Sequence, residues 1–122
     1  MTVRVAVLAQ DLIWADRLTL AVKAAGGEPV RAATLERFEE ALVGGDAAIV
    51  DLTALAYDGV VAIAVAHAAG TRVLAVGQHD DHELRKRALA AGADRVFAYR
   101  KLFEDGPATI SAWLGRLAGV GS

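Results

Sequence analysis

Asp51 ends an apolar run, residues 47–50, and begins the segment DLTALAYDG at 51–59. A carboxylate at the carboxyl end of a buried parallel strand lies where open α/β sheets bind ligands and carry out chemistry. A carboxylate at that point can also end the strand or cap the next helix. The choice between these roles depends on the elements that position Asp51.

Short β-rich runs alternate with helical patterns along the whole chain. The five runs are residues 3–9, 29–33, 47–52, 72–77 and 95–100. This alternation predicts one parallel sheet with helices on both of its faces.

The segments between the runs carry the usual start and stop signals of helices. Thr34 and Asp80 are candidate N-caps, and Glu83 follows Asp80 at the spacing of a capping box. Pro107 fits the first turn of the last helix. Glycines stand where the earlier helices should end, at 26, 44, 70 and 92.

Two helical segments differ in how much of their surface should be buried. Residues 59–69 are apolar nearly all round, which favours a central helix between two neighbours, with an exposed partner groove as the alternative. In the last helix one stripe should face the sheet, since its apolar residues fall at helical spacing: Ile110, Trp113, Leu114 and Leu117.

Length and composition indicate one domain that covers residues 1–122. The chain has no cysteine, which excludes disulfide scaffolds, thiolate metal sites and cysteine nucleophiles. A net charge of −2 gives no general attraction to nucleic acid or membranes, and no apolar run is long enough to cross a bilayer. We expect a cytoplasmic domain with neither kind of partner. Signatures of dinucleotide, nucleoside triphosphate, hydrolase and cobalamin sites are missing, and we expect no enzyme activity.

The pair formed by Asp51 and Asp58-Gly59, seven residues apart, resembles the D-x-x-M-P-x-x-D-G loop of receiver domains of two-component response regulators. Residues 77–93 have the length and the Gly-Ala ending of the fourth helix of that family, so the resemblance covers essentially the whole chain. It implies a doubly wound (βα)5, flavodoxin-like fold. Its three layers would enclose a parallel sheet of strand order 2-1-3-4-5.

In that family a histidine kinase phosphorylates the strand-three aspartate, and two acidic residues after strand one help to hold Mg²⁺. The resemblance implies that Asp51 stands at the phosphoacceptor position and Asp11 at one of the acidic positions. Beside Asp11 stands Gln10, a weak neutral ligand, so Gln10 and Asp11 form at most a relic cation site. Asp11 could instead cap the first helix, and Asp58 is expected to cap the third.

The positions that read out phosphorylation are also altered. Gly77 falls where the family has Thr or Ser, so no hydroxyl is present. An ungapped count puts Tyr99 at the position of the family's lysine. Two extra residues would instead put Lys101 there, and we predict that Lys101 is the nearest cationic match. In neither register is the strand-five switch residue, Val96 or Ala98, aromatic.

These losses predict a pseudo-receiver, a protein-interaction module that works without phosphorylation, with no cofactor beyond weakly bound Mg²⁺ and no resident metal. One alternative is an atypical but active receiver that is phosphorylated on Asp51 with the help of Asp11 and Lys101. Another is a flavodoxin-like domain that binds a small ligand in the cleft at the carboxyl ends of strands one and three.

The resemblance further implies protein partners, with a histidine kinase or an output domain as candidates. It also implies a homodimer through the face formed by the fourth helix, fifth strand and fifth helix. The basic residues Arg85, Lys86, Arg87 and Arg95 would give this face an electrostatic rim.

Overall fold

The computed structural model describes the backbone of residues 2–119 and the side chains of residues 2–115. Strands and helices alternate strictly in the described chain. In order they are β1 (Arg4–Leu8), α1 (Leu12–Ala24), β2 (Glu28–Ala32), α2 (Leu35–Leu42), β3 (Ala47–Asp51), α3 (Gly59–Ala68), β4 (Arg72–Gly77), α4 (His82–Ala91), β5 (Arg95–Ala98) and α5 (Tyr99–Gly119).

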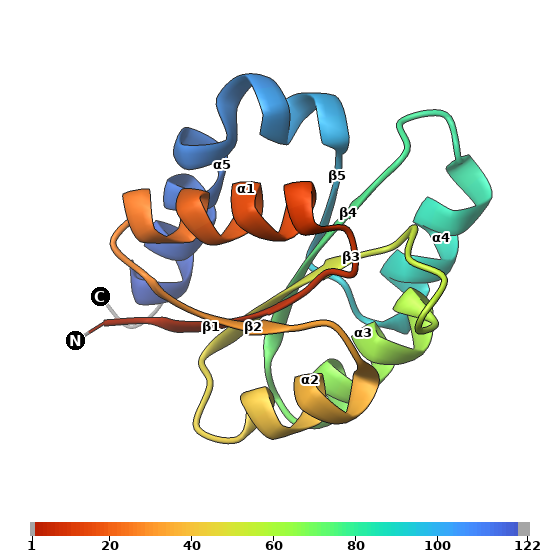
Figure 1. The fold of residues 1–122 in the computed structure, drawn as a ribbon, viewed down its shortest axis with the longest axis horizontal. Coiled ribbons are helices and arrows are strands. Elements are labelled where there is room, and N and C mark those ends of the chain that lie inside the picture. The colour runs from red at the N-terminus through yellow and green to blue at the C-terminus, as the bar shows by residue number, and fades with distance from the viewer. Residues whose placement is uncertain (1, 120–122) are drawn as a thin grey trace.

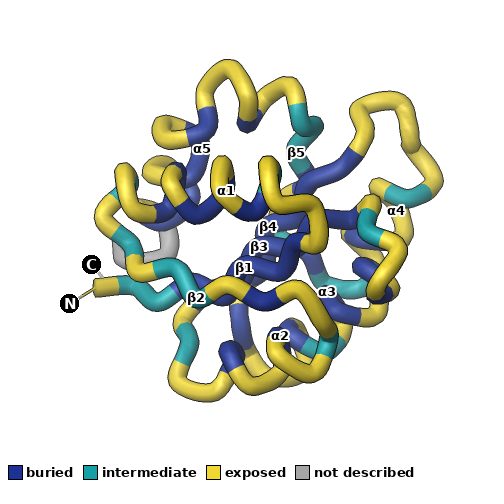
Figure 2. Tube along the Cα trace, in the orientation of Figure 1, coloured by how far each residue is buried: buried dark blue, intermediate teal, exposed yellow. Residues whose placement is uncertain are grey.

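The strands form one parallel sheet in the order β2-β1-β3-β4-β5. Helices α1 and α5 cover one face, and α2, α3 and α4 cover the other (Figure 1). The residues of β3 are buried throughout, as expected for a central parallel strand with helices on both sides (Figure 2). This arrangement confirms the predicted three-layer (βα)5 fold and its strand order. No helix within residues 2–119 is long and apolar enough to span a bilayer.

The core lies on both faces of the sheet, and the predicted helix faces contribute to it. In α5 the stripe of Ile110, Trp113 and Leu114 is buried against α1 and the sheet, as predicted; the side chain of Leu117 lies outside the described residues. Helix α3 lies between α2 and α4, which fits the central-helix interpretation. Its Ile63 is fully buried, whereas Val61 on its outer side is 45% exposed.

Most helix ends agree with the sequence signals. Thr34 caps α2, accepting a hydrogen bond from the Arg37 amide at 3.2 Å. The N-cap of α4 is Asp81 rather than Asp80, and its Oδ1 accepts from the Leu84 amide at 3.0 Å. The four predicted helix-ending glycines all have positive φ.

The end of β5 differs from the prediction in a way that affects the site. The strand stops at Ala98, two residues earlier than expected, and Tyr99 is already the first residue of α5. Helix α5 is interrupted at Asp105, whose φ and ψ are −147° and 34°, so Pro107 lies near the start of its second part. Tyr99 is therefore placed at the carboxyl edge of the sheet, two strands away from Asp51.

Candidate functional site

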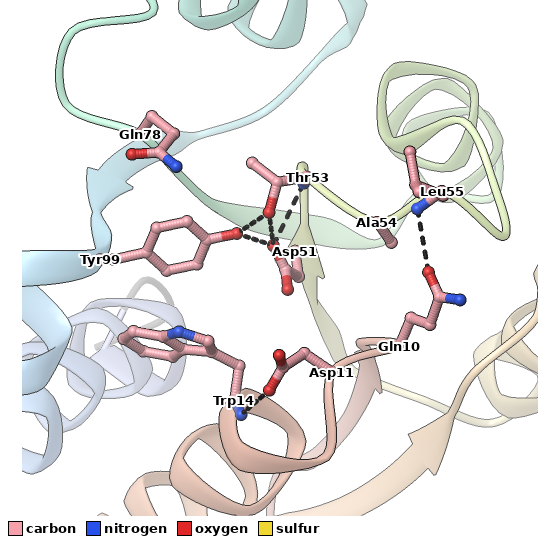
Figure 3. A pocket seen from close by; sticks show the side chains of 9 residues that line it. All are labelled: Gln10, Asp11, Trp14, Asp51, Thr53, Ala54, Leu55, Gln78 and Tyr99. Carbon is pink, nitrogen blue, oxygen red and sulfur yellow. Dashed lines mark hydrogen bonds between the residues drawn. The ribbon is translucent and has the colours of Figure 1, made fainter.

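Asp51 is the last residue of β3, and its side chain lies at the floor of a pocket of about 470 Å³. The residue is only 2% exposed, although the pocket itself opens at the carboxyl edge of the sheet (Figure 3). The lining residues come from the loops after β1, β3 and β4 and from the starts of α1 and α5: Gln10, Asp11, Trp14, Asp51, Thr53, Ala54, Leu55, Gln78 and Tyr99.

One oxygen of the Asp51 carboxylate takes all the hydrogen bonds that this side chain makes with described residues. Its Oδ1 accepts from the amide and from the hydroxyl group of Thr53, both at 3.2 Å. It also accepts from the hydroxyl group of Tyr99, which in turn contacts the Thr53 hydroxyl. Asp51 therefore organises its own loop and the start of α5.

Tyr99 lies at this site because α5 starts directly after β5. Its ring is half-buried and packs against Trp14, with ring centroids 4.6 Å apart and an interplanar angle of 40°. Burial raises the pKa of the Tyr99 hydroxyl, and the hydrogen bond to Asp51 raises it further. Tyr99 thus remains a neutral hydrogen-bond donor to Asp51 near neutral pH.

A second tyrosine, Tyr57, holds the main chain beneath the pocket. Its hydroxyl donates to the carbonyl oxygen of Asp51 at 2.7 Å and contacts that of Leu8 at 3.2 Å, so it joins the ends of β3 and β1. Burial raises the pKa of Tyr57, and the negative charge of Asp51 adds to the shift. Sequence reasoning missed this residue, because nothing in the loop pattern tells whether a tyrosine faces solvent or carbonyl groups.

Asp11 and Asp58 both cap helices. Oδ1 of Asp11 accepts from the amides of Ile13 and Trp14 at 2.9 and 3.1 Å, at the start of α1. Oδ1 of Asp58 does the same at the start of α3, through two contacts at 2.9 and 3.2 Å. Of these two aspartates, only Asp11 lines the pocket with Asp51.

Gln10 connects the loop after β1 to the loop after β3 by hydrogen bonds. Its Oε1 accepts from the backbone amides of Leu55 and Ala56 at 2.9 and 3.0 Å. The sequence placed Gln10 in a relic cation site, but its side-chain oxygen is engaged with the loop after β3. The donor set left for Mg²⁺ is then the carboxylates of Asp11 and Asp51, and nowhere among residues 2–115 do three acidic, histidine or cysteine side chains gather as metal ligands. Mg²⁺ commonly keeps several waters and takes only one or two carboxylates from a protein, so Asp11 and Asp51 are the residues that would hold it here.

Gly77 lies at the end of β4, where Leu52 occupies the neighbouring space. A Cβ atom at position 77 would stand 3.2 Å from Cδ1 of Leu52. On its other side, Leu52 is close to Gly59, where an added Cβ would stand 3.0 Å from its Cα atom and 3.1 Å from Cδ2. Leu52 is 7% exposed and so fills the space between the two glycines.

Lys101 does not line the Asp51 pocket. Its Nζ lies 3.7 Å from Oδ2 of Asp105 in the next turn of α5, and the side chain is about half exposed. It lines a different pocket of about 490 Å³, next to Arg95 and Phe97. The register with two extra residues predicted a lysine beside Asp51; the ungapped register, which puts Tyr99 there, matches the structure, because β5 ends at Ala98.

Comparison with known proteins gives a clear result for the fold. The sequence matches no protein-family model and no curated protein. The structure is similar to the BeF3-activated receiver domain of DrrB, a Thermotoga maritima protein, with a TM-score of 0.81, 18% identity and coverage of 97% of this chain and 98% of that one.

Two further solved structures agree. A CheY-like response regulator receiver domain protein from Methanospirillum hungatei gives a TM-score of 0.73 at 20% identity, over 92% of this chain and 96% of that one. A two-component response regulator from Clostridium difficile gives 0.81 at 14% identity, over 95% and 98% of the two chains. The chain therefore has the fold of response regulator receiver domains.

Proposed function

We propose that this chain is a receiver-like protein-interaction module that works without phosphorylation of Asp51. The observation that carries the proposal is the hydrogen bonding of the Asp51 carboxylate. Its Oδ1 is held by Thr53 and Tyr99, two uncharged residues, and no lysine, arginine or histidine is among the residues that line the pocket.

Phosphoryl transfer to a carboxylate depends mainly on positioning and on cations that offset the charge of the transferred group. In this pocket two carboxylates, Asp11 and Asp51, would face that group with no cationic side chain to offset it. Releasing Oδ1 for attack would also break its bonds to Thr53 and Tyr99, each worth about 1 to 3 kcal/mol. The uncompensated charge raises the barrier for either carboxylate oxygen, and the hydrogen bonds raise it further for attack by Oδ1.

The pocket also has fewer contacts that could couple a phosphoryl group to a change of conformation. Gly77 offers no hydroxyl group, and Leu52 fills the adjacent space. Moving a two-state equilibrium from 1:99 to 99:1 takes about 5.5 kcal/mol of differential binding. The loss of a hydroxyl contact and of a charged contact together removes roughly half of that energy.

The alternative of an active receiver is favoured by one specific observation. Oδ2 of Asp51 takes no hydrogen bond from the described residues and borders the pocket, so one carboxylate oxygen is available as a nucleophile. With Asp11 as the nearby acidic residue, Asp51 would then accept a phosphoryl group from a histidine kinase.

Acetyl phosphate with Mg²⁺ separates the two functions, with an established receiver domain as the positive control. We expect intact-mass spectrometry to find no phosphoryl adduct on this chain, and beryllofluoride to leave the amide resonances of β4 and β5 in place. A stoichiometric adduct that disappears in Asp51→Asn, together with shifts that reach β5, would overturn the proposal.

As a protein-interaction module, the chain would work in the cytoplasm on a histidine kinase, an output domain or a second copy of itself. The groove between α4, β5 and the start of α5 supports this use, since Arg95 and Lys101 line it together with the half-buried Phe97. Three basic residues, Arg85, Arg95 and Lys101, line the groove against one acidic residue, Asp94, and this balance suits an acidic protein surface.

A further inference from the structure

The pocket above Asp51 carries negative charge that the lining residues do not neutralise. Asp11 and Asp51 both border it, and every other lining residue is uncharged near neutral pH. The nearest basic side chain on α1, that of Arg17, lies over the rings of Trp14 and Phe103 at 5.8 and 4.4 Å from their centroids. Arg17 is not among the lining residues, so the carboxylates of Asp11 and Asp51 face the pocket without a basic side chain in its lining.

A second, independent feature is the free half of the Asp51 carboxylate. Asp51 as a whole residue is only 2% exposed. The hydrogen bonds that its side chain accepts from described residues all end on Oδ1. Figure 3 shows the other oxygen without a partner and directed toward Asp11 across the pocket. This oxygen faces the pocket and is not a closed-off buried atom, so it is open to a ligand that donates hydrogen bonds.

The third feature is an aromatic wall. The half-buried rings of Trp14 and Tyr99 lie side by side, 4.6 Å apart between centroids. Figure 3 shows both rings on one side of the pocket, with Asp11 and Asp51 next to them. Aromatic faces attract cations, and planar cations can also stack on them.

These three features select a chemical class of ligand. A cation would neutralise the negative charge, hydrogen-bond donors would pair with the free Oδ2, and a flat group would pack on the aromatic rings. A guanidinium group combines all three properties, since it is planar, permanently charged and can donate two parallel N–H hydrogen bonds to a carboxylate. A volume of about 470 Å³ also lies within the range of small-ligand pockets.

We propose that this pocket binds a guanidinium group, carried by a small molecule or by an arginine side chain of the protein partner. The guanidinium donates to Oδ2 of Asp51 and to the carboxylate of Asp11, and it packs against the aromatic wall of Trp14 and Tyr99. The inference rests on the proposed function to the extent that a module working without phosphorylation leaves the pocket open to another cation.

The test is a titration of the whole chain, without Mg²⁺ or phosphodonor, followed by two-dimensional NMR. The probes are n-butylguanidinium, its neutral analogue n-butylurea, and the peptide acetyl-Gly-Arg-Gly-amide. We expect saturable shifts of the Trp14 indole and of the Thr53 and Leu55 amides with the two guanidinium probes and none with the urea. Tighter binding of the peptide points to a partner's arginine, and tighter binding of the free compound points to a small molecule; both results support the site.

Matched variants separate this site from general attraction to an acidic surface. Asp51→Asn keeps the acceptor for Tyr99, and Asp11→Asn keeps an N-cap, while each removes one charge. Each should weaken guanidinium binding about tenfold or more, the effect of losing a charge-assisted hydrogen bond. Asp16→Asn removes a charge on α1 outside the pocket, where Asp16 pairs with Arg31, and should leave the affinity unchanged.

Three results would overturn the inference. They are no saturable binding of either guanidinium probe, equal binding of n-butylurea, and equal affinity of all three asparagine variants. None of them bears on acetyl phosphate labelling, so failure of this inference leaves the proposed function standing. Labelling of Asp51 would instead overturn the proposed function, whatever the guanidinium titration shows.

Discussion

The hydroxyl group of Tyr99 donates a hydrogen bond to Oδ1 of Asp51, so the first residue of α5 is tied to the last residue of β3. The two residues are 48 positions apart and are separated in the sheet by β4. Asp51 therefore helps to hold the carboxyl edge of the sheet together, a role that requires an acceptor but no phosphorylation.

This role leads to a prediction for Asp51 itself. Asp51→Ala removes the acceptor that serves Thr53 and Tyr99, and we expect the free energy of unfolding to fall by about 1 to 3 kcal/mol. Asp51→Asn keeps an oxygen in the same place and should change it by less than about 1 kcal/mol. Urea denaturation of the three proteins measures both values. An alanine variant as stable as the wild type would contradict the structural role.

The two tyrosines predict how stability changes at alkaline pH. Burial, followed by the effect of Asp51, raises the folded-state pKa values of Tyr57 and Tyr99 above the ordinary value of 10.0. In the unfolded chain both hydroxyls ionise near pH 10, whereas in the folded chain they keep their protons. The unfolded state therefore binds fewer protons above about pH 10, and stability that is fully present below that pH is lost as the pH rises.

Urea midpoints measured between about pH 8 and 11 test this pH dependence. The variant Tyr57→Phe, Tyr99→Phe should be less stable than the wild type at neutral pH, because both hydrogen bonds are gone. Its stability should nevertheless fall less steeply above pH 10. Identical slopes for the two proteins would show that neither hydroxyl is protected in the fold.

Gln10 should control the motion of the loop after β3. In Gln10→Ala the amides of Leu55 and Ala56 lose their acceptor, so we expect their hydrogen exchange to become about tenfold faster with little change in global stability. Gln78→Ala is the matched control, since Gln78 lines the same pocket but its side chain bonds to no other residue within the described range. Equal exchange rates in the two variants would count against the loop contact.

The groove beside β5 gives a prediction for association. Arg85 is a poor test residue because its Nη1 donates to the carbonyl oxygen of Val96 at 2.8 Å and so supports the fold. Arg95→Glu combined with Lys101→Glu changes the groove without that bond, and should weaken binding to a partner or a second copy several-fold, more strongly at low salt. Sedimentation velocity measures self-association, and biolayer interferometry measures binding to a candidate partner.

The control for the groove is Arg37→Glu on α2, an exposed residue on another helix. It changes the net charge in the same direction but leaves the groove intact. If it weakens association as much as the double variant does, the effect comes from net charge and the groove is not the interface.

The fold was predictable from local signals that repeat along the chain. Apolar runs, glycines with positive φ and short polar caps such as Thr34 and Asp58 each depend on neighbouring residues only, so the sequence displays them directly. The location of Asp51 followed from the same reasoning, because it is the residue at which a buried strand ends.

The contacts within the site were less predictable, since they depend on single-residue registers and on distant loops. Whether Tyr99 or Lys101 reaches Asp51 depends on where β5 ends, and a difference of two residues reverses the answer. The bonds from Gln10 to the loop after β3 and from Tyr57 to Leu8 join segments more than 40 residues apart, and no local pattern encodes them.

Leu52 has a consequence for the residues that position 77 can accept. Its side chain lies between Gly59 and Gly77, and a Cβ atom at either position would come within 3.2 Å of it. A serine or threonine at position 77 would require the Leu52 side chain to shift by a few tenths of an ångström, or a smaller residue at 52, which alone leaves a cavity in the core. Positions 52 and 77 are therefore expected to show epistasis, because the effect of a side chain at 77 depends on the size of the residue at 52.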